Sequence, residues 1–202
     1  MPLHVPDPPQ DSLAALRDAL GALAERGQFS ARGLRRARPE QLSATVPHQV
    51  FVLGLRDAAD GAVLDRAQPV GWRYLLEVEQ EVVASAETRS LEDGRHSFSL
   101  VNDGPFVRGT VEALALAESV ADKEEGAVEL RLLHVPALYL MSVWLRPSGA
   151  EEAEGGRFIP IAPAPSGIEA GRVYESAEFL ARVRELAQAV PELTPDDTRG
   201  GG

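Results

Sequence analysis

Residues 127–147 read AVELRLLHVPALYLMSVWLRP, and the second half of this stretch decides the fold. Between positions 137 and 145, Ser142 is the one polar residue, so the run is apolar at even and odd positions alike. Because successive side chains of a strand point to opposite faces, such a run has to be covered on both sides. We therefore predict a central strand over 137–145, with other elements packed above and below it.

Three amphipathic helices are predicted to flank the sheet, over about 12–25, 106–121 and 176–189. In each segment apolar residues recur at spacings of three and four, which places them on one helix face. In the first segment these residues are Leu13, Leu16, Leu20 and Leu23. A further short helix is expected to begin at Pro39 and to run through Leu42 and Ala44.

Other segments favour strands. Residues 46–55 and 128–134 are rich in β-branched and apolar residues, and 158–161 is predicted as a short edge strand. From position 70 to 78 the even residues are apolar, which favours a strand, although Leu75, Val78, Val82 and Ala86 also fit a helical period. A turn at 90–94 and a strand over 96–101 would complete a hairpin. Because strands and helices are grouped rather than alternating, we predict an α+β fold with a mainly antiparallel or mixed sheet.

The chain is expected to divide into three parts. Residues 1–45 are read as an N-terminal arm and helical segment with a basic cluster, and 46–190 as the α+β core domain. Residues 191–202, which end in three glycines, are read as a flexible tail.

Composition narrows the class of protein. The chain has 202 residues, is 44% hydrophobic and contains no cysteine, which excludes disulfides and thiolate metal sites. Its apolar runs are shorter than the roughly 18–20 residues of a membrane span. The first ten residues lack the regions of a secretory signal, so we expect a cytoplasmic protein without membrane contact. The predominance of arginine, with Lys123 as the single lysine, is typical of bacteria with G+C-rich genomes.

Charge is unevenly distributed. The net charge is −11, yet residues 1–50 hold six arginines against five acids, so the remainder carries the acidic excess. An acidic surface repels phosphate backbones, which disfavours nucleic acid as a partner. The basic cluster consists of Arg32, Arg35, Arg36 and Arg38. It is either a solvated turn that balances the acidic body, or a docking patch for an acidic partner or an anionic ligand.

Catalytic signatures are scarce. The sequence contains no HExxH, GxSxG or phosphate-loop motif, and we predict neither a metal nor another cofactor. The best candidate acid–base residues are Asp93, His96 and Asp103 around the hairpin, and His134 beside a proline. Asp93 could hold the His96 tautomer across the turn, as general bases require, but aspartates also favour turns for backbone reasons alone.

These observations favour a non-catalytic protein-binding or assembly component of a bacterial cytoplasmic system, with the basic cluster as its docking site. The alternative hypothesis is a small-molecule hydrolase that uses the four Asp and His candidates. Homo-oligomerisation through an exposed strand edge at 158–161 is a third hypothesis.

Overall fold

The computed structural model describes residues 3–29, 31–35, 37–61, 64–124, 126–149 and 156–191, with the backbone alone for Arg32 and Pro39. Its helices are α1 (Gln10–Glu25), α2 (Leu55–Ala59), α3 (Pro105–Ala121) and α4 (Ser176–Ala189), with short 3-10 turns η1 (Arg32–Leu34), η2 (Pro39–Gln41), η3 (Leu64–Arg66) and η4 (Pro136–Leu138). Its strands are β1 (Leu3–His4), β2 (Leu42–Val52), β3 (Gln68–Val78), β4 (Glu81–Ser90), β5 (His96–Asn102), β6 (Val128–Val135), β7 (Leu140–Pro147), β8 (Arg157–Pro160) and β9 (Tyr174–Glu175).

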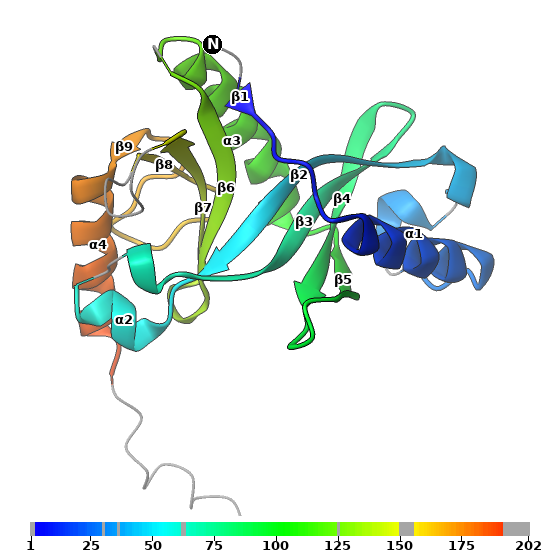
Figure 1. Ribbon diagram of the computed structural model, residues 1–202, viewed down its shortest axis with the longest axis horizontal. Coiled ribbons are helices and arrows are strands. Elements are labelled where there is room, and N and C mark those ends of the chain that lie inside the picture. Colours follow the sequence, from blue (N-terminus) through cyan, green and yellow to red (C-terminus); the bar gives the residue numbers. More distant parts are fainter. Residues whose placement is uncertain are drawn as a thin grey trace, which may run out of the picture.

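The strands form one nine-stranded sheet in the order β5-β4-β3-β2-β6-β7-β8-β9, with β1 also paired to β6. The pairs of β6 with β1 and with β2 are parallel, and the other pairs are antiparallel. Figure 1 shows a strongly twisted sheet with α4 at one end and α1 at the other. The predicted α+β class with a mainly antiparallel or mixed sheet is confirmed, as are the three flanking helices to within two residues.

β7 is the covered strand that the sequence predicts. It lies between β6 and β8, and Trp144 packs on the α4 side, where its ring stacks on Phe158 at 5.8 Å between centroids. Val143 and Leu145 point to the opposite face, into the cluster that α3 covers. Both faces of the strand are therefore hidden from solvent.

The predicted start of this strand, at 137, is wrong. Pro136 lacks the N–H that a sheet needs and opens η4. Tyr139 then takes a left-handed conformation with φ 51°, which reverses the chain so that Leu140 pairs with Val135. As a result Tyr139 is 82% exposed and lies outside the core.

Three further expectations need correction. Strand β4 was not predicted: a two-residue turn at Glu79 and Gln80, both with positive φ, joins it to β3, so no helix spans this region. β4 then pairs with β5 and is the first strand of the hairpin that the sequence predicts around the turn at 90–94. The helix expected through Leu42 and Ala44 is instead the start of β2. The strand predicted at 158–161 is β8, and it is not a free edge, because β9 pairs with Arg157 and Phe158 and the Gly171 N–H donates to the carbonyl of Pro160. None of the helices in the described ranges is long and apolar enough to cross a membrane.

Candidate partner-binding surface

α1 is fixed to the sheet by a buried hydroxyl cluster. Ser12 is fully buried, and its Oγ lies 2.7 Å from Oη of Tyr74 and 2.6 Å from Oγ1 of Thr88. Leu16 and Leu20 pack beside this cluster against β3 and β4. The first predicted helix is therefore an integral cover of the sheet.

The segment that follows α1 is also anchored. Phe29, Ala31 and Leu34 are buried in the same apolar cluster. Gly33 lies directly on β4, since a Cβ built there would be 2.6 Å from Cβ of Val83. This close approach holds the basic segment against the sheet.

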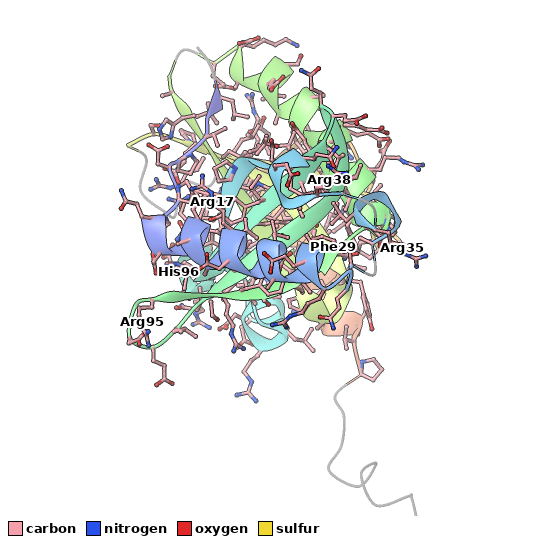
Figure 2. All side chains as sticks on the ribbon, turned by 90° about the vertical axis from the view of Figure 1, so that its right-hand side faces the viewer. Arg17, Phe29, Arg35, Arg38, Arg95 and His96 are labelled. Atoms are coloured by element: carbon pink, nitrogen blue, oxygen red, sulfur yellow. The ribbon has the colours of Figure 1, made fainter. Side chains whose placement is uncertain are left out.

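The described arginines of the basic segment face outward. Arg35 and Arg38 are exposed, and Arg17 of α1 is exposed at the same end of the molecule (Figure 2). We call these three residues the arginine surface. None of them forms an ion pair with a residue in the described ranges. Arg36 and the side chain of Arg32 lie outside the described part of the chain.

A groove runs between α1 and β2 beside the arginine surface. Its volume is about 450 Å³, and we call it the α1 groove. It is lined by Leu13, Arg17, Leu20, Gly21, Leu42, Ser43 and Ala44. A Cβ built on Gly21 would meet no atom within 4 Å, so this part of the groove is open.

β2 has an unpaired edge along this groove. Residues 42–45 pair with β3 on one side, whereas pairing with β6 begins only at Gln49. Val46, with φ 44°, and the register shift between Thr45 and His48 turn the strand away from β6. No backbone hydrogen bond joins 42–45 to a described residue outside β3. We call this segment the β2 edge.

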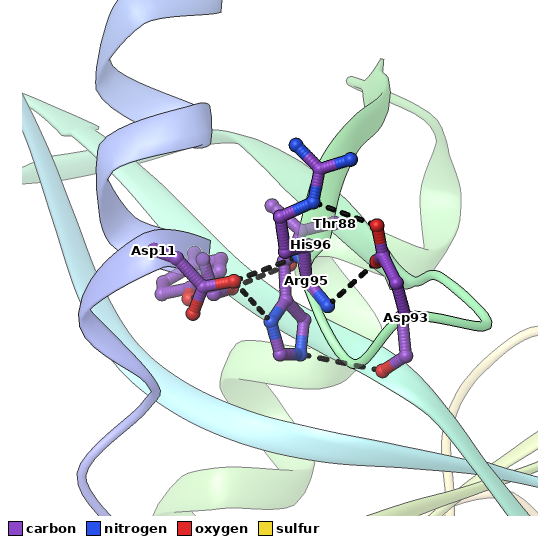
Figure 3. Close-up of polar contacts among 8 residues, drawn as sticks. Asp11, Thr88, Asp93, Arg95 and His96 are labelled. Carbon is purple, nitrogen blue, oxygen red and sulfur yellow. Dashed lines mark hydrogen bonds and ion pairs between the residues drawn. The ribbon is translucent and has the colours of Figure 1, made fainter.

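His96 has a carboxylate partner, but it is Asp11 rather than Asp93. Oδ2 of Asp11 lies 3.0 Å from Nδ1 of His96 and accepts the His96 backbone N–H at 2.8 Å (Figure 3). On the other side of the ring, Nε2 is 3.3 Å from Oγ of Ser90. Asp93 instead accepts from the backbone and side chain of Arg95, which lowers the pKa of Asp93. The hydrogen bond with His96 likewise lowers the pKa of Asp11.

The remaining two candidates lie apart from the hairpin turn. Asp103 is exposed in the connection from β5 to α3. His134 is half-buried near the end of β6, and its pKa is lowered by burial and by the nearby charge of Arg73. The side-chain hydrogen bonds of His96 go to Asp11 and Ser90, and none joins it to His134 within the described part of the chain.

Arg73 is the centre of a second polar cluster, under α3. It is 1% exposed and donates to Oγ of Ser85 at 3.1 Å and to the sulfur of Met141 at 3.0 Å. Its Nε lies 3.8 Å from Oε1 of Glu87. Burial raises the pKa of Glu87, and the cation of Arg73 opposes this shift.

His48 is buried beside Arg73. Its Nδ1 donates to the carbonyl of Val46 at 2.8 Å, which assigns Nε2 as the unprotonated nitrogen. Burial, and then the charge of Arg73, lower the pKa of His48 to about 3. The ring is therefore neutral at pH 7, and at 2% exposure it is closed to substrates.

We also searched the described residues for groups of side chains that could bind a metal ion. Among the described residues, no three His, Asp or Glu side chains are grouped so that they could hold a metal ion.

Sequence reasoning missed Arg17, Asp11 and Ser90. Arg17 is the polar residue of a leucine-rich helix face, a signal that could have linked it to the basic segment. No local signal joins Asp11 to His96, since 85 positions separate them. Comparison of the chain with protein families, with curated proteins and with solved structures found no match.

Proposed function

We propose that the chain is a non-catalytic protein-binding or assembly component of the bacterial cytoplasm, which docks an acidic partner protein on the arginine surface. The observation that carries this proposal is the set of three exposed arginines on anchored elements. In a chain of net charge −11, Arg17, Arg35 and Arg38 have no ion-pair partner within the described residues.

Because the basic segment and α1 are anchored to the sheet, a docking role for the arginines is favoured over the alternative of a solvated turn. Ser12 fixes α1, and Phe29 and Leu34 fix the basic segment, so the three cations need little further ordering when a partner binds. Pre-organised charges lose less conformational entropy on association than charges on a flexible arm. Complementary charges also raise the rate of encounter, and the effect weakens with added salt.

Charge reversal on the full-length chain tests the proposal. The variant is Arg17→Glu/Arg35→Glu/Arg38→Glu, and the matched control is Arg56→Glu/Arg108→Glu/Arg184→Glu. The control arginines are exposed on α2, α3 and α4, and they too lack ion pairs with described residues. Truncation at residue 45 is unsuitable, because it would uncover the cluster around Tyr74.

Both proteins are used to capture partners from a bacterial lysate, with quantification by mass spectrometry at low and high salt. We expect a defined acidic protein that the control retains, the variant loses, and high salt releases. Native mass measurement then shows whether this partner is another protein or a second copy of the chain. Equal recovery by variant and control would contradict the proposal.

A second candidate function, a serine hydrolase, is favoured by one observation. Asp11, His96 and Ser90 stand in the order of orienting acid, base and nucleophile, with gaps of 3.0 and 3.3 Å. His96 would take the Ser90 proton as the hydroxyl attacks an acyl carbon, and would give that proton to the leaving group as its bond to the same carbon breaks; water would then release the acyl group from Ser90. The α1 groove does not include these residues, and Asp11 is 46% exposed, which weakens this candidate. Labelling by a fluorophosphonate that is lost in Ser90→Ala and retained in Ser97→Ala would support it, and absence of labelling would exclude it.

A further inference from the structure

We infer that the β2 edge takes up an extended peptide segment of the acidic partner, which adds a strand to the sheet beside the α1 groove. This inference rests on the proposed function, because it names how the partner of the arginine surface binds.

Backbone hydrogen bonding is the first support. Alternate residues of a strand direct N–H and C=O groups away from the neighbour they pair with. Residues 42–45 are paired to β3 alone, so the outward groups of this segment have no partner among the described residues. Unpaired strand edges are templates for an added strand, and such addition is a common mode of peptide recognition.

The shape beside the edge is the second support. Leu42 and Ala44 point to the face that α1 covers, where Leu13 and Leu20 form the apolar wall of the α1 groove. Gly21 leaves this wall open. An added strand would place alternate side chains over these leucines, which suits valine or isoleucine.

The charges around the groove determine where the partner segment carries its acidic residue. Arg17 is the one charged residue of the seven that line the groove. Glu77, on the neighbouring strand, already accepts a hydrogen bond from Thr45 at 2.8 Å. Near Val46 a second groove, of about 320 Å³, is lined by Glu118 and Asp122, which would repel an acidic side chain there. The partner segment should therefore carry its carboxylate on the face that meets Arg17, with apolar residues on either side of it.

A designed peptide with this pattern is the probe. It is a blocked, fluorescently labelled Thr-Val-Thr-Glu-Thr-Val-Thr, which is extended and places Glu and both Val on one face. One matched peptide replaces the central Glu by Lys. A second keeps every side chain but carries N-methyl groups at alternate residues, which removes the donors needed for strand pairing.

Fluorescence anisotropy measures the affinity of each peptide for the full-length protein. Loss of two backbone hydrogen bonds is expected to weaken the N-methylated peptide about tenfold or more. Arg17→Glu should weaken the Glu peptide and strengthen the Lys peptide, each by about fivefold or more. Arg26→Glu is the control, because Arg26 is exposed at the C-cap of α1, about two and a half turns beyond Arg17 and so on the opposite side of the helix.

The outcomes separate the inference from the function it rests on. Equal binding of the plain and N-methylated peptides would overturn strand addition and leave acidic docking standing. If Arg17→Glu and Arg26→Glu changed the affinity for the Glu peptide equally, this would contradict the proposal that Arg17 of the arginine surface binds the partner's carboxylate. No binding of the Glu peptide up to about 1 mM would overturn the inference, while partner capture by the arginine surface would still decide the proposed function.

Discussion

Ser12 of α1 and Tyr74 of β3 share a buried hydrogen bond of 2.7 Å, 62 positions apart in the chain. Ser12 Oγ also lies 2.6 Å from the hydroxyl of Thr88, so one side chain joins α1 to two strands. This link holds Arg17, about one and a half turns later, in place over the α1 groove.

We predict that Ser12→Ala lowers the free energy of unfolding by about 1–3 kcal/mol, because it leaves two buried hydroxyls short of a partner. Urea unfolding followed by circular dichroism measures the change. Ser119→Ala, at an exposed position of α3, should change the same free energy by less than about 0.5 kcal/mol. Equal effects of the two substitutions would show that the hydroxyl cluster does not fix α1.

Gly33 and Gly21 should respond to alanine with opposite signs. Gly33→Ala forces a methyl group to within 2.6 Å of Cβ of Val83 and should cost about 1–3 kcal/mol of stability. Gly21→Ala projects into open space on α1 and should gain about 0.5–1 kcal/mol through higher helix propensity. Thermal unfolding of the two variants compares them, and a neutral Gly33→Ala would contradict the close packing of η1 on β4.

Substitution by alanine should lower the free energy of unfolding strongly at Trp144, which lies in the aromatic core, and little at Tyr139, which lies outside it. Trp144 is 1% exposed and stacks on Phe158, so Trp144→Ala should cost about 3–5 kcal/mol of unfolding free energy. Tyr139→Ala, at an exposed turn position, should change this free energy by less than about 0.5 kcal/mol. A large loss of unfolding free energy for Tyr139→Ala would contradict the placement of Tyr139 outside the core.

His48 should make stability fall in mild acid. Its pKa in the folded state is about 3, below the ordinary value of 6.5, so the unfolded chain binds a proton between these values and the folded chain does not. Stability contributed by the neutral ring is complete above about pH 6.5 and is lost as the pH falls towards 3, by roughly 2 kcal/mol between about pH 7 and about pH 5. The half-buried His134, whose pKa is also lowered, acts in the same direction.

The variant His48→Gln cannot take up this proton, and it isolates the contribution of His48 from that of the carboxylates and His134. Urea unfolding at the two pH values should show a shallower loss for the variant than for the natural chain. Identical losses in both proteins would mean that His48 does not carry this pH dependence.

The sequence predicts what depends on local patterns. The leucine spacing of α1 and the two-sided apolar run of β7 are visible in the chain, and both elements are present. The β3–β4 turn was missed because Glu79 and Gln80 adopt positive φ without the Asn-Gly or Asp-Gly pair that usually marks such turns. In β4 the small residues around Ser85 carry little strand preference.

The candidate surface could be predicted only in part. The basic segment stands out in the sequence, and Arg35 and Arg38 are indeed exposed. The β2 edge depends on where β2 leaves β6, and the α1 groove depends on how α1 crosses the sheet. Both are tertiary relationships between distant segments, as is the contact of Asp11 with His96, so no local pattern reveals them.

Amide hydrogen exchange on the full-length protein, with and without the Glu-containing peptide, tests the account most directly. Added strand hydrogen bonds would slow exchange at outward-facing amides within residues 42–45 and leave the amides of α4 unchanged. Protection confined to α4 or to the β4–β5 hairpin, with no change at 42–45, would contradict the assignment of the β2 edge as the place where the partner binds.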